Sequence, residues 1–205
     1  MKQYPTIAGD VRPDVDIYMF DKLDGSNIRA EWSPKRGFYK FGSRKQLIDE
    51  SHFLGESISL IKRDHEKALT DIFKKERFEK VTCYFEFHGS KSFAGDHAKD
   101  EPHVCTLLDV EVYKKGFMTP KDFLKAFQGQ VPIPAMLYHG KANQEIIAQI
   151  RNGTFPGMTF EGVVCKAAAY KQWSLPVMFK IKNIKWLDKV FEIHGHDRRL
   201  LEEKL

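Results

Sequence analysis

The sequence predicts an α+β fold built mainly from antiparallel strands. Runs rich in aromatic and β-branched residues dominate the middle of the chain, as expected for strands. Helical patterns fall between these runs without the regular alternation that a parallel sheet requires. The 205 residues, 42% of them hydrophobic and 30% charged, are enough for one substantial globular domain.

The predicted strands are short segments bounded by polar residues, glycine or proline. The first of them leads directly into a lysine, and the next two form a hairpin around Pro34 to Gly37. Together they cover residues 15–23, 26–32, 38–44, 81–87, 104–113, 160–166 and 176–182.

Four segments have the pattern of helices. Apolar residues recur at roughly helical spacing within 56–76. Thr119 followed by proline is a suitable start for a helix through Phe127, and Asn143 can cap another that ends near a glycine. A loosely amphipathic pattern begins at Ile184. We expect one domain over residues 1–190 and a short helical tail over 191–205.

Composition limits the class of protein. No stretch approaches the roughly 20 apolar residues of a transmembrane helix, and the first residues lack the apolar core of a secretory signal. Cys83, Cys105 and Cys165 form no CxxC pair, which indicates reduced thiols buried in strands of a cytoplasmic protein. The net charge of +5 is compatible with a polyanionic partner but does not identify one.

The stretch FDKLDGSN places Lys22 between Asp21 and Asp24, directly after an apolar run. A lysine amine with an ordinary pKa of about 10.4 is almost fully protonated at pH 7, so a nucleophilic lysine needs a lowered pKa. Burial, or the cations Lys180 and Lys182, would lower it. The two aspartates would raise it unless they bond elsewhere. Taken alone, Lys22 also fits an ordinary surface lysine.

Three further strands carry charged residues among apolar ones. Glu86 lies between aromatic residues in CYFEFHG, so it either faces water or lines a cleft where it binds a hydroxyl or hydrated metal. Glu161 and Lys166 bracket the apolar residues of EGVVCK. Lys180 and Lys182 alternate with apolar residues, which puts both ammonium groups on one strand face. That face is either a solvated edge or a clamp for a phosphate.

Taken together, four of these stretches resemble a known set of motifs. In chain order, KLDG at 22–25, FEFHG at 85–89, EGVVCK at 161–166 and KIK at 180–182 are similar to motifs I, III, IV and V of the covalent nucleotidyltransferases. That superfamily comprises the ATP- and NAD-dependent DNA ligases, the RNA ligases and the mRNA capping guanylyltransferases. The resemblance covers nearly the whole chain and implies a nucleotidyltransferase domain with antiparallel sheets flanked by helices.

The resemblance implies a role for each matching residue. Lys22 would attack the α-phosphorus of ATP, expel pyrophosphate and form a lysyl–AMP phosphoramidate. Lys180 and Lys182 would contact the α-phosphate and stabilise the transition state. Glu86 would contact the ribose and, together with Glu161, hold a hydrated Mg²⁺.

Further nucleotide-binding residues follow from the same resemblance. Arg44, in FGSRK, looks like the motif Ia arginine that reads the ribose or an incoming 5′-phosphate. Asp21, Asp24 and Lys166 belong to the same expected nucleotide site because they lie within or beside motifs I and IV. Leu108 stands where the family's motif IIIa carries an aromatic residue that stacks on adenine.

Two features indicate the branch of the superfamily. Asn27, five residues after Lys22, resembles the asparagine of the T4-type RNA ligases that seal nicks in duplex RNA. Only 23 residues follow Lys182, too few for the OB-fold that DNA ligases and capping enzymes append. The resemblance therefore implies an ATP- and Mg²⁺-dependent RNA ligase that acts on nicked or end-bearing duplex RNA.

Three alternatives stay open on the sequence. The chain fits a DNA ligase, or a stand-alone adenylyltransferase domain that needs a partner to bind the polynucleotide. It also fits a nucleic-acid-binding module that has kept the fold without turnover, although Lys22, Lys180 and Lys182 are all present.

Overall fold

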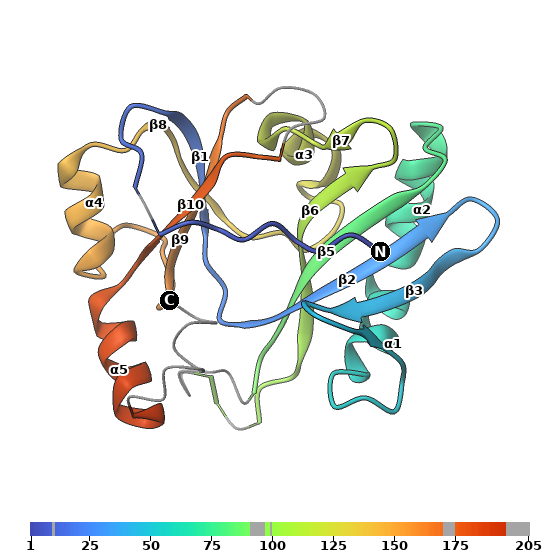
Figure 1. The fold of residues 1–205 in the computed structure, drawn as a ribbon, viewed down its shortest axis with the longest axis horizontal. Coiled ribbons are helices and arrows are strands. Elements are labelled where there is room, and N and C mark those ends of the chain that lie inside the picture. The colour runs from blue at the N-terminus through green and yellow to red at the C-terminus, as the bar shows by residue number, and fades with distance from the viewer. Residues whose placement is uncertain (10, 91–96, 99, 170–174, 196–205) are drawn as a thin grey trace.

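The computed structural model describes residues 1–9, 11–90, 97–98, 100–169 and 175–195, which form two antiparallel sheets flanked by helices (Figure 1). The smaller sheet has the order β10 (Met178–Lys182), β9 (Gly162–Ala167), β1 (Asp16–Asp21) and β8 (Met136–Lys141). The larger has the order β4 (Leu47–Ile48), β3 (Gly37–Ser43), β2 (Gly25–Ser33), β5 (Val81–His88), β6 (Val104–Val112) and β7 (Gly116–Phe117). The predicted α+β fold is confirmed, and the described strands close into no barrel.

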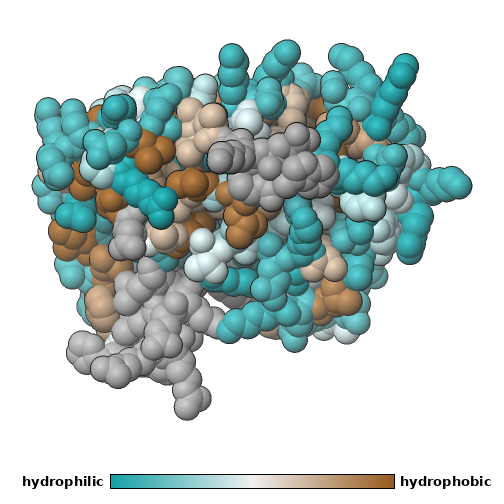
Figure 2. Space-filling view, turned by 45° about the horizontal axis from the view of Figure 1, so that its top comes forward, coloured by the Kyte–Doolittle hydropathy of each residue, from teal (hydrophilic) through white to brown (hydrophobic). Residues whose placement is uncertain are grey.

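The described residues form five helices: α1 (Glu56–Asp64), α2 (Glu66–Lys75), α3 (Pro120–Phe127), α4 (Gln144–Arg151) and α5 (Ile184–His194). Helices α1, α2 and α3 bury apolar residues in one cluster with the larger sheet, and α4 packs on the smaller sheet. Hydrophilic side chains project from most of the face in Figure 2, with smaller apolar patches among them. No described helix is long and apolar enough to cross a membrane.

All seven predicted strands are present, with ends shifted by a few residues, and the hairpin of β2 and β3 is confirmed. The three cysteines are free and buried, in β5, β6 and β9. The helix expected within 56–76 is two helices, because the backbone departs from helical geometry at His65 (φ −120°, ψ −32°). There the buried imidazole Nε2 lies 2.7 Å from the carbonyl oxygen of Cys105.

Strand β8 was missed by the sequence analysis, as were the two-residue strands β4 and β7. Among the described strands, β8 pairs with β1 alone, at the edge of the smaller sheet, and none of its residues is fully buried. A strand without a buried face carries no alternation for the sequence to reveal. Helix α5 runs across the boundary expected at residue 190, and residues 196–205 of the expected tail lie outside the described residues.

The chain passes from the smaller sheet to the larger at residues 22–24. β1 ends at Asp21, and the next backbone N–H, that of Lys22, donates to the Gly162 carbonyl at 3.0 Å. β2 begins at Gly25, where a Cβ atom would lie only 2.3 Å from the carbonyl oxygen of Phe87. The motif needs glycine because β2 approaches β5 so closely. Lys22 is thereby placed between the two sheets instead of within a strand.

The first nine residues cross both sheets, as the dark-blue trace in Figure 1 shows. Ala8 forms a parallel bridge with Phe179 of the smaller sheet. The hydroxyl of Tyr4 donates to Asp109, and Lys2 pairs with Glu111, both in β6. This segment therefore covers the polar face of the larger sheet and forms one wall of the space between the sheets.

Gly162 provides a test of this packing. Its φ is +135°, and an added Cβ would lie 2.2 Å from the Ile181 carbonyl oxygen of the adjacent strand. We expect Gly162→Ala to lower the free energy of unfolding by about 1–3 kcal/mol and the Tm by roughly 3–10 °C, measured by thermal denaturation. Gly9→Ala is the control, because nothing lies within 4 Å of its Cβ position. Equal melting temperatures for the two variants would contradict the close approach of β9 and β10.

Candidate active site

A pocket of about 760 Å³ lies where the two sheets meet. One wall is the N-terminal segment from Tyr4 to Gly9, and the connection from β1 to β2 forms another. The pocket receives most of the residues that the sequence singled out: Asp21, Lys22, Asn27, Arg44, Glu86, Leu108, Glu161, Lys166 and Lys180. Segments up to 176 residues apart in the sequence, from Tyr4 to Lys180, thus converge on one cavity.

The centre of the site is a carboxylate shared by two lysines. Oε1 of Glu161 lies 2.8 Å from Nζ of Lys22 and 3.1 Å from Nζ of Lys182. Glu161 is 3% exposed, and the side chain of Lys182 is 8% exposed. A buried carboxylate requires such partners, and each lysine is held in turn by the same oxygen. The structure therefore brings together the predicted nucleophile Lys22, the predicted phosphate-contacting Lys182 and the predicted metal ligand Glu161.

The pKa values of Lys22 and Lys182 shift in opposite directions. Burial lowers the pKa of Lys22, but the charges of Glu161, Glu86 and Asp24 together raise it above its ordinary value. Burial also lowers the pKa of Lys182, and the cations Lys22 and Lys180 add to this, so that it falls to about 8. The expectation that cationic neighbours would lower the pKa of Lys22 is therefore wrong for this structure.

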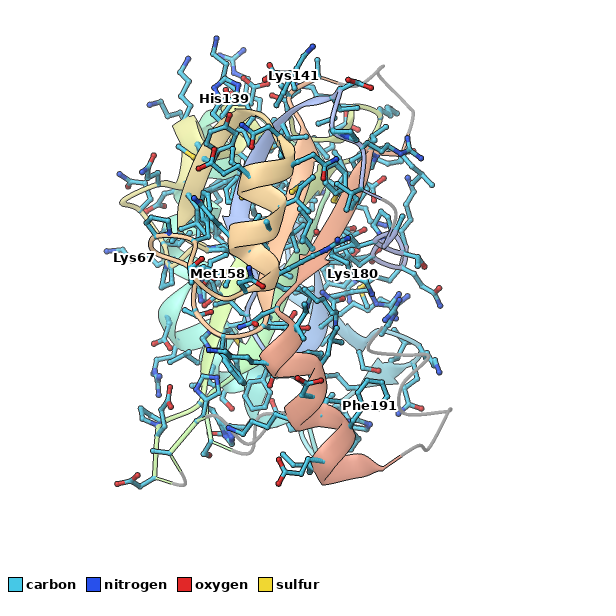
Figure 3. The ribbon with its side chains drawn as sticks, turned by 90° about the vertical axis from the view of Figure 1, so that its left-hand side faces the viewer. Lys67, His139, Lys141, Met158, Lys180 and Phe191 are labelled. Carbon is cyan, nitrogen blue, oxygen red and sulfur yellow. The ribbon has the colours of Figure 1, made fainter. Side chains whose placement is uncertain are left out.

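Lys180 belongs to β10 and is labelled in Figure 3. Burial, the charge of Lys22 and the charge of Arg44 lower its pKa, against the opposing effect of Glu161. Arg44 is exposed in the bend between β3 and β4 and lines the pocket. Among the described residues, five cations line the cavity, where they can stabilise the charge of a polyphosphate: Lys22, Arg44, Lys45, Lys166 and Lys180. Lys182 is not among the lining residues and lies against Glu161.

The two aspartates beside Lys22 differ in what they contact. Oδ1 of Asp21 accepts from the backbone N–H of Thr159 at 2.9 Å and from its hydroxyl at 3.1 Å. Burial raises the pKa of Asp21, against these hydrogen bonds. These side-chain hydrogen bonds of Asp21 thus go to Thr159 and not to the Lys22 ammonium, whereas Asp24 is 7% exposed and helps to raise the pKa of Lys22.

Asn27 and Glu86 lie directly opposite each other on β2 and β5 and both line the pocket. Nδ2 of Asn27 donates to the Phe85 carbonyl at 3.3 Å. Its Oδ1 is buried and accepts no hydrogen bond from any residue that the structure describes. A buried amide oxygen is costly to leave unpaired, so a hydrogen-bond donor on a bound ligand would complete it.

Leu108 and Lys166 have structural contacts that the sequence did not predict. The register of β5 and β6 shifts at Leu108, which forms a bulge facing the pocket. Nζ of Lys166 donates to the Leu108 carbonyl at 2.7 Å and to Oδ2 of Asp109 at 2.8 Å. The same carboxylate accepts from Tyr4. Lys166 therefore joins the two sheets beside the pocket, in addition to lining it.

The sequence analysis missed the N-terminal segment and the role of Asp109. A signal was present, because Asp109 and Glu111 lie in the otherwise apolar run VCTLLDVEV and need buried partners. Those partners are Tyr4 and Lys2, more than 100 residues away in the sequence. No local pattern identifies contacts at that separation.

The side chains that the structure describes do not by themselves complete a site for a divalent metal, so phosphate oxygens of the substrate and water would have to supply the other ligands. The described residues contain no group of three or more His, Cys, Asp or Glu side chains able to hold a metal. Mg²⁺ commonly binds one or two carboxylates and completes its shell with waters and phosphate oxygens. Glu86 and Glu161, which both act on Lys22 and line the pocket, meet that requirement.

Glu161→Gln tests the charge balance of the site. The substitution removes the carboxylate that most strongly raises the pKa of Lys22, so we expect that pKa to fall in a lysine-detected NMR titration. Glu31→Gln is the matched control, since Glu31 is a buried carboxylate 3.1 Å from Lys80 elsewhere on the larger sheet. It should lower the pKa of Lys80 and leave Lys22 unchanged. An unchanged Lys22 pKa in Glu161→Gln would contradict the ion pair.

Comparison with known proteins identifies the fold. No protein-family model matches the sequence, and no curated protein matches it. Among solved structures, a Naegleria gruberi RNA ligase variant with ATP and Mn superposes with a TM-score of 0.63 at 15% identity, covering 86% of this chain and 51% of that chain. A second such variant with ATP and Mn gives 0.62 at 13% identity, covering 91% and 59%.

The chain thus spans between half and three-fifths of the length of these ligases. At this level of identity the similarity establishes a shared fold and leaves activity open. The fold of this chain is that of the RNA ligase nucleotidyltransferase domain.

Proposed function

We propose that the protein is an ATP-dependent RNA ligase that joins 3′-hydroxyl and 5′-phosphate ends through a lysyl–AMP intermediate. The observation that carries this proposal is the ion triad of Lys22, Glu161 and Lys182, of which Lys22 and Glu161 line the pocket together with Lys180. The fold shared with RNA ligases supports the same reaction class. An ordinary surface lysine faces water, whereas Lys22 lies between two sheets and pairs with a buried carboxylate.

The first step is the transfer of AMP to Lys22. The neutral Nζ attacks the α-phosphorus of ATP, a P–N bond forms, and the bond from the α-phosphorus to the bridging oxygen breaks. Pyrophosphate leaves with the bond electrons, and the amine loses its proton. Lys180 and Lys182 contact the α-phosphate oxygens and stabilise the negative charge that develops there.

Lys22 must first lose the proton that its carboxylate neighbours stabilise. Glu86 and Glu161 hold its pKa high in the protein alone. A Mg²⁺ bound between these carboxylates and the phosphates would neutralise their charge and act as an electrostatic stabiliser. Of the three carboxylates that raise the pKa of Lys22, only that of Asp24 would then keep its full effect, and this pKa would fall toward the range in which the amine is nucleophilic.

The remaining steps need a polynucleotide. AMP moves from Lys22 to the 5′-phosphate, forming a phosphoanhydride, and the 3′-hydroxyl then attacks that phosphorus and releases AMP. Arg44, exposed at the pocket, is suited to bind the incoming 5′-phosphate. Duplex RNA is bound largely through its backbone, so we expect the affinity to fall as salt rises.

We keep nicked or end-bearing duplex RNA as the proposed substrate because Asn27 lines the pocket with a buried, unsatisfied amide oxygen. This is the residue in which the sequence resembles the nick-sealing RNA ligases. A DNA ligase, or an adenylyltransferase domain that relies on a partner, would use the same first step. The first alternative therefore differs from the proposal in the polynucleotide, and the second in its need for a partner to bind it.

Covalent labelling tests the nucleophile. With Mg²⁺ and ATP labelled on the α-phosphate, the wild-type protein should acquire label that persists in a denaturing gel. Lys22→Ala and Lys22→Arg should acquire none, since a guanidinium keeps the charge but is no nucleophile at neutral pH. Lys67→Arg, an exposed lysine on α2, should label normally. Equal labelling of Lys22→Ala and wild type would overturn the assignment.

Sealing assays test the substrate. The wild-type protein should seal a nick in duplex RNA more efficiently than the same nick in all-DNA duplex, and Asn27→Ala should lose sealing. Asn27→Asp retains the buried oxygen and should retain part of the activity. Preferential sealing of DNA nicks would contradict the RNA assignment, and label transfer to Lys22 without any sealing would favour an adenylyltransferase that needs a partner.

A further inference from the structure

Trp186 makes a close contact with a lysine of the site. It lies in the first turn of α5 and is 0% exposed, and its ring centroid is 3.9 Å from Nζ of Lys182. Cation–π contacts are strongest when the cation is removed from water, as it is here. The ammonium of Lys182 is therefore bounded on one side by the Glu161 carboxylate and on another by an indole face.

The orientation of the indole favours this contact over its own hydrogen bonding. Nε1 of Trp186 is buried, and none of the described residues accepts a hydrogen bond from it. A buried tryptophan usually pairs its N–H. A ring placed only to fill the core could turn its N–H toward an acceptor. The unpaired N–H of Trp186 therefore indicates that the ring is oriented by the contact of its face with Lys182.

The start of α5 is fixed to the segment that carries Glu161. The backbone N–H of Asn183 donates to the Glu161 carbonyl at 3.1 Å, and its Nδ2 donates to the Phe160 carbonyl at 3.1 Å. Its Oδ1 accepts from the backbone N–H of Lys185 at 3.0 Å and caps the helix. Trp186, Lys182 and Glu161 are thus held as one unit.

We propose that Trp186 is a positioning residue whose ring face holds the ammonium of Lys182 in place to contact the α-phosphate. This rests on the proposed function. When Glu161 binds a metal ion with the substrate, Lys182 loses the charge that now holds it, and the indole face keeps the ammonium from turning away. The contact thereby holds Lys182 in position both when Glu161 pairs with it and when Glu161 binds a metal ion.

A double-mutant cycle on Lys22 adenylylation tests the proposal. Trp186→Met keeps an apolar side chain without a ring and should reduce the single-turnover rate about tenfold, with little change in the ATP concentration at half-saturation. Trp186→Phe should recover most of the rate. In a Lys182→Met background, Trp186→Met should cause no further loss, because the contact is already gone. Val190→Ala, a buried residue of the same small apolar cluster, should leave the rate unchanged.

Two results would overturn the proposal. One is a loss in Trp186→Met that persists undiminished in the Lys182→Met background, since this shows a purely structural role. The other is an equal loss in Val190→Ala.

The contact is also measured without activity, by NMR of the protein with ¹³C-labelled lysine. The ε-methylene of Lys182, assigned by its absence in Lys182→Met, should show an upfield ring-current shift that Trp186→Phe retains in part and Trp186→Met abolishes. An ordinary shift in the wild type overturns the proposal even if Trp186→Met fails to fold. A wild-type protein that takes up no AMP but shows this shift would refute the proposed function while leaving the contact established.

Discussion

The carboxylate of Glu161, shared by Lys22 and Lys182, is the interaction on which the rest of the site depends. A buried charge of this kind is stable only when its partners are held in place, and here the acid and its two partners come from three separate segments. Each partner is positioned by backbone pairing: Lys22 by the Gly162 carbonyl, Lys182 by the register of β10 against β9. The fold can be understood as the scaffold that brings one acid and two amines within 3.1 Å.

The two sheets are joined at this triad and at a second junction beside it. Lys166 crosses from β9 to the bulge at Leu108 and to Asp109, and Tyr4 reaches the same carboxylate from the N-terminal segment. Both junctions use a buried acid that accepts from two side chains. The cavity is therefore bounded by polar contacts that fix its width, while the apolar clusters lie on the outer faces of the sheets beneath the helices.

The sequence predicted the fold class, the seven main strands and the convergence of the charged residues, because alternation and motif order are local or collinear signals. It could not predict that His65 splits a helix, since this depends on a distant carbonyl. Nor could it predict the direction of the pKa shift of Lys22, because two of the carboxylates that raise it, Glu161 and Glu86, are brought near only by the fold. For Asp21, the sequence did allow a physical argument: its carboxylate would raise the pKa of Lys22 unless it bonded to another residue, and it bonds to Thr159.

The central claim is that Lys22 becomes the covalent carrier of AMP. Peptide mapping by mass spectrometry after incubation with ATP and Mg²⁺ tests it directly, because the measurement locates the modified residue. The account predicts one added AMP, on the peptide that contains Lys22, and its loss when pyrophosphate is supplied to reverse the reaction. AMP on Lys182 or Lys180 instead, or an unmodified protein under these conditions, would contradict it.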